Sequence, residues 1–268
     1  MRLIQTVFYK TEMPGWVLPG RFRIALLADL HNNIHPGLMS LLEEAAPDAV
    51  VIAGDMVNRP NRLLPPRFTR GYGCVKRLAA RFPVYYALGN HESAWRRHPR
   101  YGRGFAAYRK ALEKKGVRFL DNESVSAGDE ARPLILTGLT LGKDPFTYSL
   151  FHRKAPDAET IRALIGEPAE NQILIAHNPQ YLAAYREWGA KLVLSGHLHG
   201  GMIRLFGRGL IGPGPELFPK HTRGLYDENG TKLIVSAGLG THTVPFRIFD
   251  PREALIVDLV KEPHGNSR

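Results

Sequence analysis

Short apolar runs recur along the chain, and most of them end in glycine or polar residues. Runs of this kind are typical of strands buried on both faces, and they predict strands at 22–28, 49–53, 84–88, 133–139, 172–176, 192–195, 233–236 and 254–260. An edge strand is expected within 1–12. Apolar residues at helical spacing predict helices at 37–46, 72–81, 105–115 and 181–188.

The order of these elements predicts the class of fold. Strands that alternate with helices favour an α/β architecture with a largely parallel central sheet. The 268 residues are enough for one sizeable core, so we expect a single domain over 1–268, with a frayed tail from about 261. Proline and glycine predict two long loops, 60–71 and 206–224.

Polar clusters follow five of the predicted strands directly. Because ligands of open α/β sheets bind outside the carboxyl ends of the strands, we expect these clusters to share one active site. If the chain stays extended after the strand at 192–195, His197 and His199 point the same way and can share a metal site. The candidate metal ligands are Asp29, His31, Asp55, Asn90, His177, His197 and His199.

These seven side chains offer only nitrogen and oxygen donors. Such a set suits Mn, Fe, Zn or Ni better than Ca²⁺ or a structural zinc site. Seven donors are too many for one tetrahedral ion, but they suit two ions that share a bridging carboxylate and clamp a phosphoryl group. Each residue alone has a simpler explanation: Asp29 can cap a helix and Asn90 can occupy a turn. Jointly, these alternatives are improbable.

The chain resembles the calcineurin-like metallophosphoesterases in five blocks that appear in the family's order. The blocks are Asp29-x-His31, Gly54-Asp55, Gly89-Asn90-His91-Glu92, His177 and Gly196-His197-x-His199. The resemblance implies an αββα sandwich in which two mixed β-sheets are flanked by helices. It assigns the first metal ion to Asp29, His31, Asp55 and His199. It assigns the second to Asp55, Asn90, His177 and His197, with Asp55 as the bridge.

The same resemblance suggests roles beside the metals. His91 faces the scissile phosphate and donates a proton or stabilises charge, and Arg59 contacts the phosphate. Relatives with a Gly-Asp-x-x-Asp-Arg block use the second Asp to support the histidine. Asn58 occupies that position here, and we expect its amide oxygen to accept a hydrogen bond from the ring of His91.

Later segments resemble the YkuE-like branch of the family. They are Gly200-Gly201-Met-Ile-Arg204-Leu, Val235-Ser-Ala-Gly238-Leu-Gly240 and Pro245-Phe-Arg247. This resemblance implies membrane association and a lipid-type substrate such as UDP-2,3-diacylglucosamine. Met202 and Ala237 depart from the branch, which tends to carry Gln and Arg there. Arg204 and Arg247 are either solvated surface charges or substrate contacts.

The net charge of +11 favours an anionic partner. Among substrates we place a lipid-linked pyrophosphate first and a cyclic nucleotide or other small phosphodiester second. A nuclease ranks third, and nucleic acid is not the expected partner, because no stripe of Lys and Arg alternates with aromatics. A non-catalytic scaffold on the same fold would have lost metal ligands, and none of the seven is lost. Two Mn²⁺ ions are the expected cofactors, with Fe, Zn or Ni as alternatives.

Localisation is predicted from cysteine usage and apolar runs. Cys74 is the only cysteine, which excludes an internal disulfide and favours a reducing compartment. No apolar run reaches the ~20 residues that span a bilayer. We therefore expect a cytoplasmic protein that binds an anionic membrane surface peripherally. The residues Leu210, Ile211, Leu217 and Phe218 either pack on the domain or form an exposed apolar patch.

Overall fold

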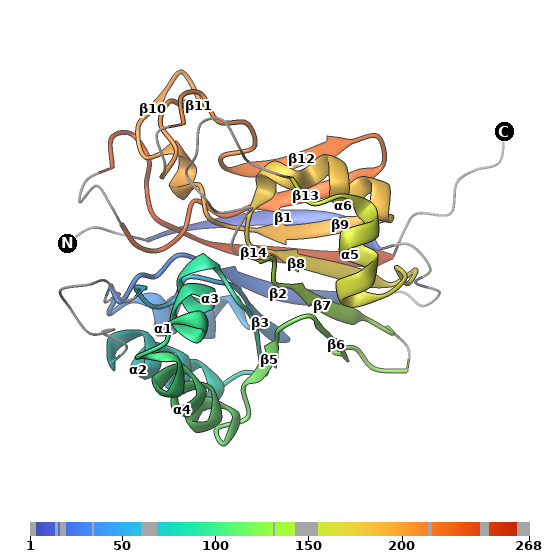
Figure 1. Ribbon diagram of the computed structural model, residues 1–268. Helices are drawn as coiled ribbons and strands as arrows, with labels where there is room; N and C mark the ends of the chain where they lie inside the picture. Colours follow the sequence, from blue (N-terminus) through green and yellow to red (C-terminus); the bar gives the residue numbers. More distant parts are fainter. Residues whose placement is uncertain are drawn as a thin grey trace, which may run out of the picture.

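Two six-stranded β-sheets face each other, and helices cover the outer face of each (Figure 1). The computed structural model describes residues 4–13, 16, 20–33, 35–59, 69–130, 132–142, 155–213, 216–241 and 247–261. This architecture is the αββα sandwich that the resemblance implied.

The first sheet has the order β1-β14-β2-β3-β4-β5. The strand β14 is antiparallel to β2 and parallel to β1, while β2 to β5 are mutually parallel. The sheet is therefore mixed, and β1 forms its edge as expected. The bounds are β1 Gln5–Met13, β2 Arg21–Leu27, β3 Ala49–Ala53, β4 Val84–Ala87, β5 Arg118–Leu120 and β14 Glu253–Lys261.

The second sheet has the order β12-β13-β9-β8-β7-β6. Its four central strands are parallel, and the two outer ones are antiparallel to their neighbours. The bounds are β6 Glu123–Ser126, β7 Ile135–Leu139, β8 Gln172–Ala176, β9 Leu192–Ser195, β12 Gly224–Glu228 and β13 Thr231–Val235. A separate hairpin pairs β10 (Arg204–Leu205) with β11 (Arg208–Gly209).

Six α-helices and two short 3₁₀ segments complete the described part of the chain. Helices α1 to α4 lie on the first sheet, and α5 and α6 on the second (Figure 1). The bounds are α1 Leu38–Ala45, α2 Thr69–Ala79, α3 Asn90–Arg97, α4 Gly102–Glu113, α5 Ala158–Ile165, α6 Leu182–Trp188, η2 Pro179–Tyr181 and η3 His199–Gly201.

Alternation along the buried strands builds three apolar layers. In β3 every residue is buried. Val50 and Ile52 pack toward the helices, and Val51 packs toward the second sheet. A third layer joins the second sheet to α5 and α6. Strands buried on both faces read as continuous apolar runs for this reason, and their carboxyl ends are held at one rim.

Several elements differ from the sequence predictions. The largely parallel central sheet expected from the order of elements is two mixed sheets, because β14 pairs antiparallel with β2 in the first and the outer strands β6 and β12 pair antiparallel in the second. The predicted loop 206–224 includes β11 and the start of β12. The helices α3 and α5 and the strands β5, β6 and β12 were not predicted. Most of the 60–71 loop and the predicted tail lie outside the described residues.

Candidate metal centre

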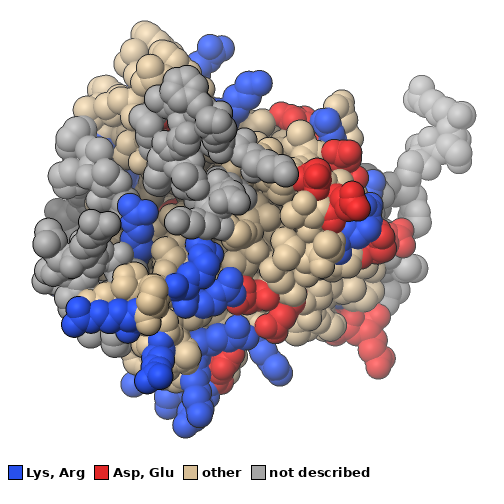
Figure 2. Space-filling view, viewed as in Figure 1, with Lys and Arg blue, Asp and Glu red and all other residues tan. Residues whose placement is uncertain are grey.

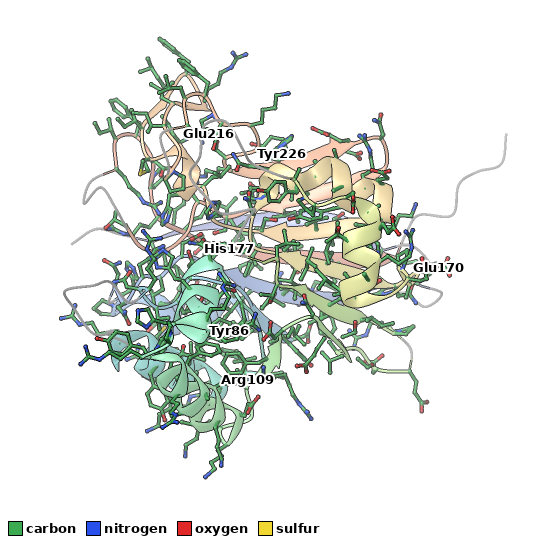
Figure 3. The ribbon with its side chains drawn as sticks, in the orientation of Figure 1. Tyr86, Arg109, Glu170, His177, Glu216 and Tyr226 are labelled. Atoms are coloured by element: carbon green, nitrogen blue, oxygen red, sulfur yellow. The ribbon has the colours of Figure 1, made fainter. Side chains whose placement is uncertain are left out.

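The predicted metal ligands meet where the two sheets present the carboxyl ends of their parallel strands. The segments that carry them follow β2, β3 and β4 in one sheet and β8 and β9 in the other. Figure 3 shows His177 between the two layers, above Tyr86 of β4. All seven predicted ligands are buried, with relative exposures between 0% and 8%. The structure thus brings together every ligand that the sequence predicted.

Asp29, His31 and His199 form the first group of donors. Asp29 Oδ1 lies 3.7 Å from Nε2 of both His31 and His199. The two Nε2 atoms are 3.1 Å apart. The other carboxylate oxygen, Asp29 Oδ2, accepts a hydrogen bond of 2.8 Å from the backbone N–H of His197, so the carboxylate is held with Oδ1 toward the histidines.

Asp55, Asn90, His177 and His197 form the second group. His177 Nε2 lies 3.2 Å from Asp55 Oδ2 and 3.1 Å from Asn90 Oδ1. Its Nδ1 donates to the carbonyl of Ala53 at 2.5 Å, which leaves Nε2 as the metal-binding atom. The His197 ring is 5.0 Å from that of His177. Ligand atoms of Asp55, His177 and His197 all lie within 4.8 Å of one another.

Asp55 connects the two groups. Its Oδ2 is 3.2 Å from His177 Nε2 and 3.9 Å from His31 Nε2. Asp29 Oδ1 is buried and has no hydrogen-bond partner among the described residues, although an unsatisfied buried oxygen is costly. A cation in the first group would satisfy it. The residues present therefore fit two divalent ions that share Asp55.

The two histidines after β9 do not converge in the way the sequence suggested. The chain does not remain extended: His197 has φ 75° and His199 has φ 47°. These left-handed conformations place the two rings in different donor groups, which is the division that the resemblance assigned to them. The conformation is uncommon for non-glycine residues and is supported here by the His197–Asp29 hydrogen bond.

Glu92 holds the turn that carries Asp55. Its carboxylate accepts from the backbone N–H groups of Asp55 (2.9 Å), Met56 (2.9 Å) and Gly89 (3.1 Å), and from Tyr86 Oη (2.7 Å). A Cβ on Gly89 would collide with Asp55 Oδ1, so only glycine lets the two loops approach this closely. Sequence reasoning gave Glu92 no role, although a Glu three residues after a helix N-cap is a known signal.

His91 is buried next to Asp55, the carboxylate that connects the two groups. Its Nδ1 accepts the backbone N–H of Arg59 at 2.9 Å, and its Nε2 is 3.8 Å from Asp55 Oδ2. The expected contact with Asn58 is absent: Asn58 Oδ1 has no hydrogen-bond partner among the described residues, and Nδ2 donates to the His31 carbonyl at 3.4 Å. The backbone of Arg59, not the side chain of Asn58, orients His91. The Arg59 side chain is exposed.

Arg204 and Arg247 make structural contacts. Arg204 donates to the carbonyls of Gly200 and Gly207. The side chain of Arg247 is only 5% exposed and is 3.2 Å from Asp250. It also donates to the carbonyls of Ala237 and Gly240 and approaches His199 Nδ1 at 3.3 Å. Both guanidinium groups therefore hydrogen-bond within the protein, and neither is a fully solvated surface charge.

The buried histidines and carboxylates perturb one another's pKa values. Burial opposes ionisation of Asp29 and Asp55, but nearby histidines outweigh it and hold the pKa of both below the usual range. Burial likewise opposes protonation of His177, yet Asp55 raises its pKa to about 10. Burial lowers the pKa of His199 to about 3. Both carboxylates are thus ionised, and a metal ion would replace the proton on His177.

Comparison with known proteins places the chain in a family. Residues 22–201 match the model of the calcineurin-like phosphoesterases. The chain belongs to this family. The match spans all five sequence blocks and all seven predicted ligands.

Individual relatives of this metallophosphoesterase align over more of the chain than the family model does. The chain is 30% identical over 258 residues to an uncharacterized metallophosphoesterase of Campylobacter jejuni, covering 92% of this chain and 61% of that protein. It is 25% identical over 248 residues to the uncharacterized metallophosphoesterase YkuE of Bacillus subtilis, covering 89% of this chain and 79% of YkuE. A 5'-nucleotidase precursor from Thermus thermophilus superposes with a TM-score of 0.49 at 14% identity, covering 90% of this chain and 55% of that one.

Proposed function

We propose that this metallophosphoesterase hydrolyses a phosphoester or pyrophosphate bond with two divalent metal ions, most readily Mn²⁺. The observation that carries the proposal is the pair of buried donor groups joined by Asp55. Bound divalent ions supply positive charge at the phosphoryl group and lower the pKa of water. Family membership supports a phosphoester as the bond that is broken.

The protein's own residues would orient and protonate the substrate. His91 accepts a backbone N–H at Nδ1, so its proton resides on Nε2, the atom nearest Asp55. From this position Nε2–H can donate to an oxygen of the phosphoryl group or of the leaving group. The exposed guanidinium of Arg59, on the neighbouring turn, is available to the phosphate.

The proposed substrate is lipid-linked, such as UDP-2,3-diacylglucosamine, because an exposed apolar projection lies beside the metal centre. It consists of the hairpin β10–β11 and the segments paired with it, and we call it the aromatic tip (Figure 1). The exposed residues of the tip are Leu205, Phe206, Leu217, Phe218, Ile248 and Phe249. Ile248 directly follows Arg247, which contacts the metal ligand His199.

The exposure and backbone conformation of the tip support contact with a partner rather than packing against the rest of the protein. Phe206, Phe249 and Phe218 are 97%, 79% and 70% exposed. All three have a positive φ, at 47°, 53° and 51°, which costs a bulky residue about 1 kcal/mol or more. Of the four apolar residues predicted either to pack on the domain or to form an exposed patch, Leu217 and Phe218 are exposed, whereas Leu210 and Ile211 are half-buried. Exposed aromatics of this kind are suited to a bilayer surface.

A basic face on the side of the first sheet supports an anionic membrane. Lys and Arg gather over α2 and α4, while many Asp and Glu lie at the opposite end of the molecule (Figure 2). Positive charge near an anionic bilayer contributes about 1 kcal/mol per residue. No helix in the described ranges has the length and apolar character needed to cross a membrane. The exposed basic residues are Arg70, Lys76, Arg77, Arg96, Arg97, Arg100, Arg103, Lys110, Lys114 and Lys115.

A hydrolysis screen of the Mn²⁺-loaded protein tests the function. It compares bis-p-nitrophenyl phosphate, cyclic nucleotides and a UDP-acyl-glucosamine. We expect turnover of the first compound, which reports a working centre, and the highest kcat/KM for the acylated substrate. Higher kcat/KM for cyclic nucleotides would replace the lipid substrate by the small diester. Full metal loading with no turnover of any compound would contradict hydrolysis and favour a scaffold.

A further inference from the structure

A cavity of about 220 Å³ lies between α1, α2 and the loop after β2, outside the cluster of metal ligands. Leu30 and Leu38 form its apolar wall on one side, and Cys74 lies on the other. Burial raises the pKa of the Cys74 thiol to about 11, so this wall carries no charge at neutral pH. A dry apolar cavity of about 150 Å³ already accepts benzene, so this one has room for a chain of about eight carbons.

The helix α2 presents one stripe of residues to the cavity. Arg70, Gly73, Cys74 and Arg77 all line it, and their spacing of i, i+3, i+4 and i+7 places them on one helical face. The two arginines stand roughly 10 Å apart along the helix axis. The stripe is therefore cationic at both ends and small or apolar in the middle.

Gly73 is not explained by packing within the protein. A glycine inside a helix costs about 1 kcal/mol relative to alanine. A Cβ built on Gly73 meets no atom within 4 Å, whereas one on the neighbouring Gly71 would lie 2.7 Å from the Met56 carbonyl oxygen. Gly71 is thus required by a close approach, but Gly73 borders open space. A ligand that occupies this space would account for the missing side chain.

Three polar groups at the cavity lack partners among the described residues, whereas Asn33 donates to the carbonyls of Leu30 and His31. Arg70 and Arg77 are exposed, and neither side chain forms an ion pair or a hydrogen bond with the described residues. Nε2 of His35 is buried and has no hydrogen-bond partner in the same part of the chain. Burial lowers the pKa of His35, so its ring is neutral at pH 7 and the positive charge at the mouth comes from the arginines.

We propose that this cavity binds an anion with an unbranched apolar chain. The chain would lie against Leu30, Leu38 and Cys74, in the space above Gly73. The anionic group would lie at the exposed guanidinium of Arg70 or Arg77, where charge-assisted hydrogen bonds add to the burial of the chain. The site rests on the cavity and its unpartnered groups, and it does not depend on what the metal centre hydrolyses.

Calorimetric titration of the full Mn²⁺-loaded chain with octane-1-sulfonate tests the proposal. This probe has the charge and the chain, and a sulfonate is a poor metal ligand. Methanesulfonate lacks the chain, and octan-1-ol lacks the charge. We expect one molecule of octane-1-sulfonate to bind at least 10-fold more tightly than either control. Binding no tighter than that of the controls would overturn the proposal. Saturating inorganic phosphate, which competes at the metal centre, should leave binding unchanged; displacement by phosphate would also overturn it.

Matched substitutions at Gly73 locate the ligand. Gly73→Leu fills the cavity from α2, and Gly73→Ala changes the helix propensity similarly but leaves most of the space. Both should unfold at or above the temperature of the unchanged protein. We expect Gly73→Leu to weaken binding at least 10-fold and Gly73→Ala by less than 3-fold. Equal binding by the two folded variants would place the ligand elsewhere. In Arg70→Gln/Arg77→Gln, octane-1-sulfonate should bind no better than octan-1-ol.

Discussion

At the scale of the residue, Asp55 carries the charge that both donor groups share. We expect Asp55→Asn to lose both metal ions, because the amide removes the only bridging charge, while His199→Ala retains part of the second site. Elemental analysis of the purified variants measures this. Glu170→Gln, a loss of one exposed negative charge far from the centre (Figure 3), is the control. Full metal content in Asp55→Asn would rule out Asp55 as the bridge.

His91 is positioned to act on the leaving group. We expect His91→Ala to lower turnover by about 10²–10⁴-fold for esters with poor leaving groups. For p-nitrophenyl esters, which need no proton, the loss should be far smaller. The measurement is kcat for a matched series of alkyl and nitrophenyl esters. An equal loss across the series would mean that His91 stabilises the phosphate rather than protonating the leaving oxygen.

Cys74 supplies a pH-dependent prediction away from the metals. Burial raises its pKa from 9.0 to about 11. Because only the thiolate reacts with alkylating agents, the folded protein should react about 100-fold more slowly than the urea-unfolded chain at pH 8. Its rate should keep rising up to pH 11, whereas the rate of the unfolded chain levels off near pH 9. The iodoacetamide rate as a function of pH measures this, and coinciding profiles would contradict burial of the thiol.

The sequence predicts which residues form the site better than it predicts their backbone conformation. The meeting of the seven predicted ligands at one rim could be foreseen, because parallel strands deliver their carboxyl ends to the same edge. The left-handed turns at His197 and His199 could not, since they depend on a hydrogen bond to Asp29, 168 residues away. The contact of His91 was assigned to Asn58 by analogy, but a backbone N–H one residue further along makes it.

At the scale of the element, Glu92 joins the start of α3 to the loop after β3. Burial, with the charge of Asp55, raises the pKa of Glu92 to about 7, so each hydrogen bond to it contributes between the values for a neutral and a charged acceptor, about 0.5–3 kcal/mol. Tyr86→Phe should therefore lower the free energy of unfolding by about that amount. Glu92→Ala, which leaves buried N–H groups of Asp55 and Met56 unpaired, should lower it by at least about 4 kcal/mol. Urea unfolding measures both.

The control for Glu92 is another helical glutamate. Glu113 forms an exposed ion pair with Arg109 at 2.7 Å, and such pairs contribute less than about 1 kcal/mol. Glu113→Ala should therefore change stability little. If Glu92→Ala costs no more than Glu113→Ala, the carboxylate does not hold the loop.

Predictability also varies among the elements. The long apolar strands β2, β3 and β8 were found because both faces are buried. Strands such as β5, with three residues, are too short to show a period. The helix α3 begins at the predicted ligand Asn90, so the sequence of its first turn is a polar cluster rather than an amphipathic pattern. When polar residues are buried at a functional site, the alternation of apolar and polar positions that predicts a helix is lost.

At the scale of the whole molecule, the aromatic tip and the basic face predict binding to anionic vesicles. We expect sedimentation with phosphatidylserine vesicles at low salt, weakened by salt because charge contributes. Phe206→Ser/Phe249→Ser should reduce the bound fraction several-fold. Phe8→Ser is the control, because Phe8 is 58% exposed but lies on β1, outside the tip. The membrane proposal would be contradicted if the unchanged protein did not bind, or if Phe8→Ser reduced the bound fraction as much as Phe206→Ser/Phe249→Ser.

The position of β14 between β1 and β2 has a consequence for biosynthesis. Glu253 follows Leu27 by 226 residues (253 − 27), so β2 is made long before its neighbour on that side. At about 5–20 residues per second, the ribosome takes roughly 10–45 s to reach β14. During that time one edge of β2 is open, and β1 has no partner in the sheet. An open strand edge invites pairing with other chains, so the nascent protein would depend on chaperones until its last strand closes the sheet.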